Sequence, residues 1–365
     1  MGVAIQHRTD RAERAGTFML NRIRKFLFFA AGVCLCTIAF CEELPMTNPL
    51  LIKPRSWCIG RFLFDRPTAS ELSSQRYMFR GETLETEHNT SLATYEAQVD
   101  ARERDLRTKM RIDPGNKNRE MNHPLLEKSF SPVRDSKVFV WKKMETSGVS
   151  FLFYSDSHIY DKGTIFNTTG QIGSSAIDQS EAIYNDMVRR IKARDNWTVP
   201  TEAGFCFDGG IVSGSSTYTE EVSQSFMLMP GRPAQLVMQM RTSMEQDQKE
   251  TLTRTLPDLR AQLNRLPGHY RILREGKRTI AGMNAEEVLF ELKEGDITSY
   301  QFYLLAPGDP GTLAKPHTSI QLLLGTTSFN PNLTPELATS PVDEAGALQV
   351  WDTLLNSLRL RPGAV

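Results

Sequence analysis

The chain has 365 residues, of which 40% are hydrophobic and 24% are charged. Its 43 lysine and arginine residues are matched by 43 aspartate and glutamate residues, so the formal net charge is zero. This balance argues against a nucleic-acid-binding protein, which needs a strongly basic surface.

The N-terminal segment has the pattern of an export signal. Basic residues at positions 22–25 precede an apolar run over residues 26–40, and an acidic stretch begins at Glu42. About fifteen apolar residues after a basic flank are typical of a secretory signal, whereas a bilayer-spanning helix needs ~20. We predict that residues 1–41 are an N-terminal extension and signal peptide, and that the product is soluble in the periplasm. The alternatives are a lipid anchor at Cys41 and an uncleaved signal that holds the protein at the membrane.

The exported part has the size of two domains. Residues 42–365 contain more acidic than basic side chains and have no second long apolar segment, which argues against a multispanning membrane protein. Their length exceeds what a single hydrophobic core usually organises.

Two cysteines lie outside the N-terminal segment, and each begins a similar run: CIGRF at residues 58–62 and CFDGG at residues 206–210. Because exported proteins meet an oxidising environment, we predict a disulfide between Cys58 and Cys206. Closing this loop would stabilise the fold by roughly 4–5 kcal/mol. The alternative is two separate buried thiols.

In the first half, the pattern predicts strands, a helix, further strands and a second helix. Apolar runs predict strands at residues 61–64, 76–79, 137–141, 150–154 and 159–166, with a hairpin turn at 146–148. Helical periodicity predicts helices at residues 91–112 and 177–193, and residues 112–124 are expected to form a surface loop.

The second half repeats this order. Strands are predicted at residues 226–229, 235–240, 269–273, 286–292, 299–306 and 319–324, with turns at 275–276 and 294–296 and a loop at 307–316. Helices are predicted at residues 247–265 and 343–360, and Pro257 should kink or split the first of them.

This repeated order predicts an α+β fold with two tandem, duplicated domains, each an antiparallel sheet with helices packed on it. We place the domains at residues 50–198 and 199–365, joined by a short hinge at residues 195–202.

No motif predicts an active site. Ser174, Ser213 and Ser215 lie outside a G-x-S-x-G pattern, and the glycine-rich run at residues 209–214 lacks the lysine of a phosphate-binding loop. A tight turn is therefore expected at Gly209 and Gly210. The histidines lack metal-ligand spacing, so the sequence predicts no catalytic residue, cofactor or metal. An exported envelope hydrolase with an unrecognised acid pair is an alternative, because such pairs need not be close in sequence.

Arg61 and Asp208 stand at comparable distances from the two cysteines. We expect an Arg61–Asp208 contact, or local backbone contacts, that support the disulfide region. A direct contact with a partner is the alternative for both residues.

The run CIGRF followed by Asp65 and Pro67, together with PTEAGFCFDGG at residues 200–210, resembles the class 4 lipase-immunity family of bacterial type VI secretion systems. The resemblance spans roughly residues 50–362, and GFCxDGG is its most specific part. It implies a periplasmic protein of two α+β domains without catalytic residues. It also implies that the protein binds a cognate phospholipase effector of the alpha/beta-hydrolase type, blocks its active site and thereby protects the producing cell.

The partner implied by the resemblance is therefore a lipase effector, with no nucleic acid and no small-molecule substrate. Two domains joined at a hinge could grip such a partner from two sides. Candidate contact surfaces are the charged helix at residues 91–112 and the apolar loop at residues 329–333. A structural envelope lipoprotein anchored at Cys41 is the remaining alternative.

Overall fold

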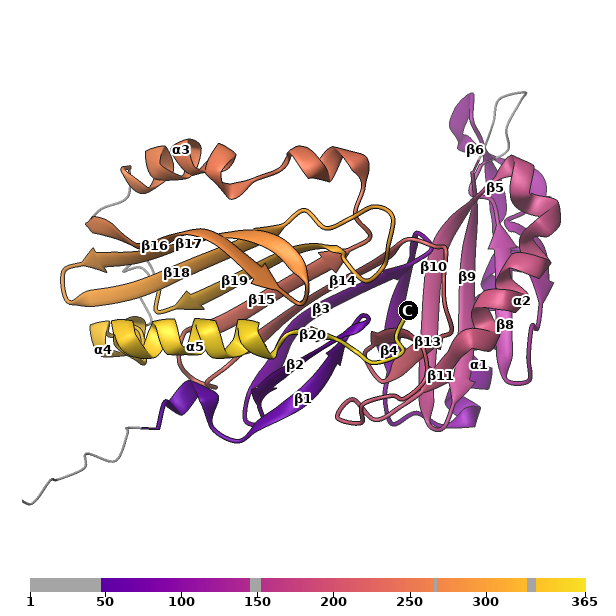
Figure 1. The fold of residues 1–365 in the computed structure, drawn as a ribbon. Coiled ribbons are helices and arrows are strands. Elements are labelled where there is room, and N and C mark those ends of the chain that lie inside the picture. Colours follow the sequence, from indigo (N-terminus) through magenta and orange to yellow (C-terminus); the bar gives the residue numbers. More distant parts are fainter. Residues whose placement is uncertain (1–46, 145–151, 266–267, 327–332) are drawn as a thin grey trace, which may run out of the picture. The chain divides into compact units, whose positions relative to one another are not determined.

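The computed structural model describes residues 47–144, 152–265, 268–326 and 333–365 of the protein (Figure 1). The predicted signal peptide, the predicted turn at 146–148 and most of the apolar loop at 329–333 lie outside the described residues. Among the residues described, no helix combines the length and apolar character needed to cross a membrane.

The first half begins with two hairpins, followed by a helix, a meander and a second helix. Its elements are η1 (Pro49–Leu51), β1 (Pro54–Ile59), β2 (Phe62–Pro67), β3 (Glu71–Phe79), β4 (Glu82–Glu87), α1 (Leu92–Thr108), β5 (Met110–Asp113), β6 (Asn116–Pro124), β7 (Leu126–Phe130), β8 (Ser136–Trp141), β9 (Leu152–Asp161), β10 (Thr164–Gly173), η2 (Ser174–Gln179), α2 (Ser180–Arg190) and β11 (Ile191–Ala193).

The second half follows the same plan. Its elements are β12 (Gly204–Phe207), β13 (Gly210–Ser213), β14 (Glu220–Met227), β15 (Ala234–Arg241), η3 (Glu245–Lys249), α3 (Leu252–Leu263), β16 (His269–Ile280), β17 (Met283–Glu294), β18 (Ile297–Ala306), β19 (His317–Leu324), α4 (Pro335–Ala338), α5 (Glu344–Ser357) and β20 (Arg359–Leu360).

A 12-stranded antiparallel sheet contains strands of both halves, in the order β16-β17-β18-β19-β15-β14-β3-β4-β10-β9-β8-β7. The pairing of β14 with β3 joins the halves, with Val222 opposite Tyr77 and Gln224 opposite Gln75. The fold is therefore α+β and dominated by antiparallel strands, as predicted. The boundary at residues 198 and 199 stays a prediction, and the main sheet runs across both sides of it.

Two three-stranded sheets flank the main sheet, with the orders β1-β2-β20 and β11-β13-β12. Each contains a hairpin from the start of one half and a short strand from the end of the other half. The strands β5 and β6 form a separate two-stranded ribbon.

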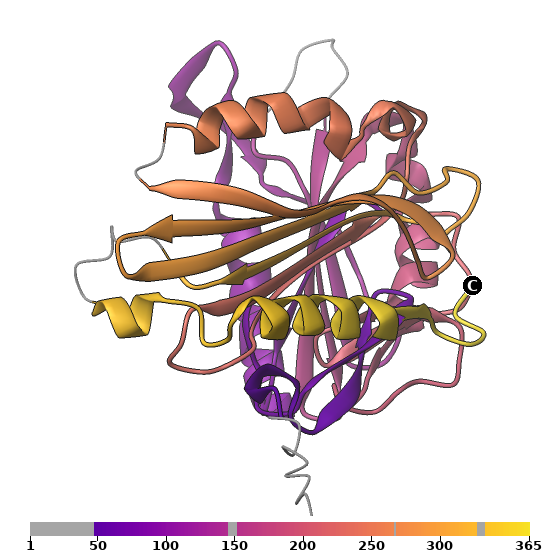
Figure 2. The same cartoon turned by 60° about the vertical axis from the view of Figure 1, so that its left-hand side comes forward.

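Helices cover both faces of the main sheet, and Figure 2 shows α3 and α5 on opposite faces of the second half. The main hydrophobic core lies on the face covered by α2, α5 and the small sheets, and it includes Trp351, Tyr184, Phe226 and Phe302. Two smaller clusters lie on the other face. One is formed under α1 around Phe139, and the other is formed under α3 around Leu256 and Phe290.

Several predicted elements were wrong in their bounds or type. The predicted single strand at 159–166 contains the end of β9, a turn at residues 162–163 and the start of β10, and the predicted turn at 275–276 lies inside the strand β16. The predicted loop at 112–124 pairs as β5 and β6. Helix α3 is not split at Pro257, because Leu252–Leu263 is one helix with the proline inside it.

Candidate interaction face and hairpin junction

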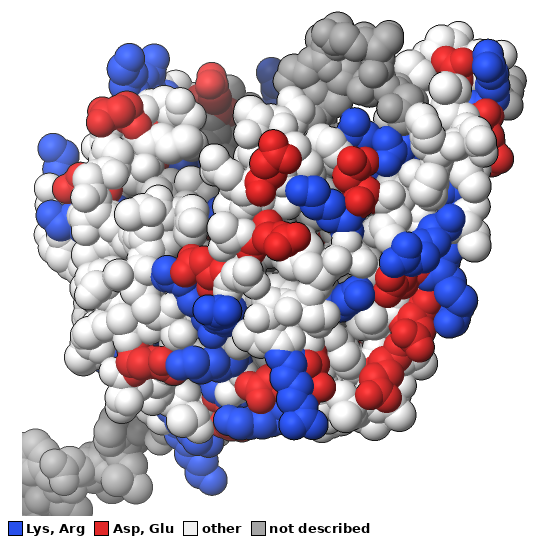
Figure 3. Space-filling model, turned by 90° about the vertical axis from the view of Figure 1, so that its right-hand side faces the viewer, with Lys and Arg blue, Asp and Glu red and all other residues white. Residues whose placement is uncertain are grey.

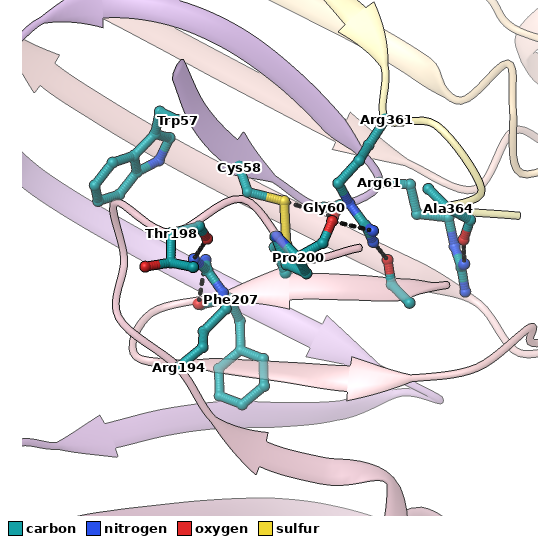
Figure 4. The surroundings of a disulfide bond; sticks show 12 residues. Trp57, Cys58, Gly60, Arg61, Arg194, Thr198, Pro200, Phe207, Arg361 and Ala364 are labelled. Carbon is teal, nitrogen blue, oxygen red and sulfur yellow. Dashed lines mark hydrogen bonds between the residues drawn. A yellow bond between two sulfur atoms is a disulfide. The ribbon is translucent and has the colours of Figure 1, made fainter. Parts of the chain in front are cut away.

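The structure joins Cys58 of β1 to Cys206 of β12 in a disulfide (Figure 4). Their Cα atoms are 6.0 Å apart, and the two residues are 148 positions apart in sequence. Both cysteines are buried and pack with Leu63 of β2. The bond therefore ties the first hairpin of one half to the first hairpin of the other.

Backbone hydrogen bonds run beside the disulfide. The Gly60 amide donates to the Cys206 carbonyl over 3.1 Å, and the Cys206 amide donates to the Gly60 carbonyl over 2.7 Å. Gly60 has a φ of +56°, and a Cβ there would lie 3.3 Å from Val222 Cγ1. A glycine at this turn allows both the left-handed backbone and the close approach of β14.

Arg61 does not contact Asp208, and the predicted Arg61–Asp208 pair is wrong. The Arg61 Nε and Nη2 atoms donate to the two carboxylate oxygens of Glu220 over 2.8 and 2.7 Å, and Nη1 donates to the Ala364 carbonyl. Burial raises the pKa of Glu220 and outweighs the opposing effect of Arg61. The pair does not form because each turn packs on the opposite half. Arg61 contacts Glu220 at the start of β14 in the second half, whereas the Asp208 turn packs on the first half.

Asp208 instead lies at the turn between β12 and β13 and contacts three residues from the first half or the linker. Its carboxylate accepts from Gln75 Nε2 over 2.9 Å and from Asn196 Nδ2 over 2.6 Å, and it lies 2.9 Å from His88 Nε2. Burial alone would raise the pKa of Asp208, but these hydrogen bonds outweigh it and hold that pKa below its usual value. Asp208 therefore fastens the second-half hairpin to the first half.

The glycines after Asp208 allow this turn to be tight, as the sequence predicts. Gly209 has a φ of +65°, and a Cβ there would lie 2.5 Å from His88 Cε1. A Cβ at Gly210 would lie 2.3 Å from the Phe207 ring. Both glycines are therefore structural residues of the hairpin.

Two arginines that sequence analysis missed hold the segment between the halves. Arg194 follows β11 and donates to five backbone carbonyl oxygens, those of Asp195, Asn196, Thr198, Phe207 and Gly210. Arg361 follows β20 and donates to three more, those of Pro200, Glu202 and Gly204 (Figure 4). Their positions after equivalent strands were the signal that could have identified them.

Trp197 anchors the same segment through stacking. Its ring packs edge-on against Trp57, with the ring centroids 5.0 Å apart. The buried Arg66 guanidinium lies 4.1 Å from the Trp57 ring centroid and 4.4 Å from that of Trp197. Burial lowers the pKa of Arg66 to about 10. The predicted hinge at 195–202 is thus fixed by both hydrogen bonds and aromatic contacts.

The main sheet has a face that its helices leave accessible, here named the open face. Alternate side chains of β14, β15 and β19 point into the main core, and the intervening ones are half-buried or exposed. The main contacts of α1 are with β6–β9 and those of α3 are with β17, on either side of these central strands. The open face consists of Ser74, Arg76, Met78, Glu221, Ser223, Gln235, Val237, Gln239, Ser319 and Gln321.

The open face is rich in short or amide side chains. One row crosses four strands through the register Arg76, Ser223, Gln239 and Ser319. The charges of Arg76 and Glu221 lie 3.6 Å apart and offset each other. This surface can therefore offer hydrogen-bond donors and acceptors with little net charge.

The charged helix α1, which was a candidate contact surface, pairs many of its own charges. Arg107 contacts Glu103 and Lys109 contacts Asp105 at the helical i,i+4 spacing. Figure 3 shows basic and acidic side chains interspersed over the side of the molecule that carries the first half. This arrangement is typical of a solvated helix face.

One group of potential metal ligands occurs among the described residues, formed by Asp247, Glu250 and His317. Arg241 donates to both carboxylate oxygens of Asp247 over 2.7 Å, so an arginine already neutralises this acid. Similarly, Asp156 pairs with Arg102, while His158 Nδ1 contacts Asn167. These contacts favour ion pairs and hydrogen-bonded strand contacts over catalytic or metal-binding arrangements.

The chain is similar over most of its length to one known protein family and to several solved structures. Residues 55–197 match the Tle cognate immunity protein 4 N-terminal domain, and residues 198–363 match the C-terminal domain of the same family. No curated protein matches the chain. The apo immunity protein TplEi of the type VI secretion system of Pseudomonas aeruginosa superposes with a TM-score of 0.70 at 20% identity, covering 85% of this chain and 97% of that one.

Two further solved structures share this fold. The crystal structure of a Tle4–Tli4 complex matches with a TM-score of 0.72 at 21% identity, covering 85% of this chain and 98% of that one. TplEi from Pseudomonas aeruginosa complexed with a peptide matches with a TM-score of 0.68 at 20% identity, covering 86% of this chain and 99% of that one.

Proposed function

Because the chain belongs to the Tle cognate immunity protein 4 family, we propose that it protects the producing cell by binding and occluding a lipase effector of a type VI secretion system. Two of the similar structures are a Tle4–Tli4 complex and an immunity protein complexed with a peptide. Both complexes support a protein partner for this chain. In this function the chain acts by binding, and its own side chains perform no catalysis.

The family match carries the proposed function, and the open face is the surface that we assign to the effector. It lies across the seam between β3 and β14, so both halves contribute to it. A broad strand surface with half-buried floor residues is stiff, because each strand is hydrogen-bonded on both sides. Such a surface loses little conformational entropy when a partner binds.

The chemistry of the open face also predicts how the effector is recognised. Its glutamine and serine side chains make neutral hydrogen bonds, and its Arg76–Glu221 pair is internally balanced. Long-range attraction between charged surfaces is screened by salt, whereas short hydrogen bonds are screened much less. We therefore expect the affinity for the effector to change less than about tenfold between low and physiological salt.

The proposed location is the periplasm, reached through the export signal at residues 1–41. The disulfide between Cys58 and Cys206 supports this location, because disulfides persist in oxidising compartments. Fractionation of producing cells should recover the chain with periplasmic markers. Recovery with cytoplasmic markers would refute this part of the proposal.

The central experiment measures binding and inhibition with a type VI lipase effector from the producing organism. The unmodified chain should bind the purified effector in calorimetry and reduce its phospholipase activity at equimolar ratio. Ser223→Trp places a bulky ring on the open face and should weaken binding at least tenfold. Ser215→Trp makes the same change at an exposed loop position outside that face, and should bind normally.

Two outcomes separate the parts of this proposal. If the unmodified chain neither binds nor inhibits the effector, the immunity function itself is wrong. If it inhibits, but Ser223→Trp inhibits as well as Ser215→Trp does, the function stands and the open face is not the contact surface.

A further inference from the structure

The two halves have the same strand order in the main sheet. The first half has the order β3-β4-β10-β9-β8-β7, and the second has β14-β15-β19-β18-β17-β16. In each half a hairpin leads through a helix to a four-stranded meander, whose last strand returns to pair with the second strand of the hairpin. The halves are therefore equivalent copies of one topology, joined at β3 and β14.

The short hairpin that opens each copy is paired with the other copy. Strand β2, at the start of the first half, pairs with β20 at the end of the second half, with Phe62 opposite Leu360. Strand β13, at the start of the second half, pairs with β11 at the end of the first, with Val212 opposite Ile191. Helix α5 packs against β2, and helix α2 packs against β13.

Side-chain contacts follow the same crossed pattern. From the first hairpin, Phe64 packs against Phe226 of β14, with ring centroids 5.4 Å apart, and Trp57 Nε1 donates to Gln224 over 3.0 Å. From the second hairpin, Phe207 packs against Phe166 of β10, with ring centroids 5.3 Å apart. The Asp208 contacts with Gln75 and His88 belong to the same set.

The disulfide lies where the two hairpins meet. It connects β1 directly to β12, next to the paired backbone bonds of Gly60 and Cys206. Neither hairpin can therefore leave its position without breaking contacts with the opposite half. Figure 1 shows β1 and β2 beside β20 and α5, and β11 and β13 beside β4 and β10.

We propose that the two halves are interlocked by reciprocal exchange of their first hairpins. Each folding unit then consists of one half without its own hairpin, completed by the hairpin of the other half. In this arrangement the segment at 195–202 is a fixed connection and not a hinge. The effector face described above is preformed, although the exchange itself does not depend on the proposed function.

The test is hydrogen exchange on the full chain, in a Cys58→Ser/Cys206→Ser background that removes the covalent link between the hairpins. Val138→Ala weakens the first-half core at β8, and Leu304→Ala weakens the second-half core at β18; both side chains are fully buried. Neither residue is in the short hairpins. Exchange of β1–β2 and β12–β13 amides is followed in peptides from each variant.

If the hairpins are reciprocally exchanged, weakening one half should loosen the hairpin that belongs in sequence to the other half. Leu304→Ala should speed amide exchange in β1–β2 at least threefold more than in β12–β13, and Val138→Ala should do the opposite. If β1–β2 loosens with the first half and β12–β13 loosens with the second half, or if both hairpins loosen equally in both variants, the proposal is overturned. Should Leu304→Ala not fold, Leu304→Val gives the same comparison with a smaller perturbation.

Discussion

At the scale of single residues, arginine guanidinium groups organise the junction by donating to backbone carbonyls. Arg194 and Arg361 together donate hydrogen bonds to eight carbonyl oxygens in or beside the segment between the halves. A guanidinium suits this role because it presents five donors in one plane. Lysine has three donors on a single nitrogen, and so could not satisfy carbonyls spread over such a segment.

The GFCxDGG run owes part of its composition to close contacts. Gly209→Ala should destabilise the protein by about 2 kcal/mol or more, because the new methyl group meets both a left-handed backbone and the His88 ring. Gly231→Ala is the matched control: Gly231 also has a positive φ, of +79°, but a Cβ there meets nothing within 4 Å. Urea denaturation compares the two variants, and equal losses would show that the His88 contact is unimportant.

Asp208 should make stability depend on acidity. Its pKa is lower in the folded protein than in the unfolded chain, so its contribution is fully present above the unfolded value of ~3.9 and is lost as the pH falls through the folded value. Asp208→Asn removes this contribution. The stability difference between the two proteins should therefore be large at pH 7 and shrink towards pH 3 in urea titrations. A difference that stays constant with pH would contradict the assignment.

The residue pairs themselves could not be predicted from sequence. Arg61 and Asp208 lie at similar distances from their cysteines, which suggested a mutual contact. Their actual partners, Glu220 for Arg61 and His88 and Gln75 for Asp208, depend on which half each hairpin packs against. Local spacing contains no information about that choice.

At the scale of elements, apolar patterning predicted most strands and helices, and the main errors were tight turns. The β3–β4, β9–β10 and β16–β17 turns use Arg80-Gly81, Lys162-Gly163 and Ala281-Gly282, all with positive φ at both residues. Two-residue turns of this kind usually contain Asn or Asp before Gly. Lys162 and Ala281 stand before the turn glycines instead of Asn or Asp, so these positions carry no turn signal. The first turn was therefore included in a predicted strand at 159–166, and the second was predicted at 275–276.

Charge-rich segments caused the other errors. Residues 116–124 form β6 although they are almost wholly polar, because β6 pairs with β5 in a ribbon outside the main sheet. A strand in a two-stranded ribbon has no buried face, so it needs no alternation of apolar residues. The hydrophobic period that identifies core strands is therefore missing there.

Helix α3 tests how much a proline costs in this fold. Pro257 lies in the sixth position of Leu252–Leu263 and cannot donate the hydrogen bond that this position would make. Pro257→Ala should slow amide exchange in α3 and stabilise the helix by up to ~3 kcal/mol. Thr255→Ala, an exposed change in the same helix, should have a much smaller effect. No slowing in Pro257→Ala would mean that tertiary contacts, and not the proline, determine the stability of α3.

At the scale of the whole molecule, the sequence predicted the duplication but not the crossing of the copies. Two similar cysteine runs and a repeated element order are visible in one dimension. Whether a hairpin packs on its own half or on the other changes no hydrophobic pattern, because its buried face is the same in both arrangements. The exchange becomes visible only in three dimensions, first of all in the pairing of β20 with β2 and of β11 with β13.

The disulfide should contribute more to the free energy of unfolding than its local packing does, because it links segments that are far apart in the sequence. In the unfolded chain a link across 148 residues removes conformational freedom worth roughly 4–5 kcal/mol. Cys58→Ser/Cys206→Ser should therefore lower the free energy of unfolding by several kcal/mol. The cysteines pack with Leu63 alone in their small cluster, so lost local packing should be the smaller part of this effect. Unfolding in urea measures the loss. Alkylation of the unmodified chain without reduction provides the control, since a mass shift at either cysteine would show a free thiol and contradict the disulfide.

Because the crossed hairpins also hold the halves together, the double-serine chain should still elute as one folded monomer. A chain that instead loses its sheet structure would show that the covalent link, and not the exchange, provides the main connection between the halves.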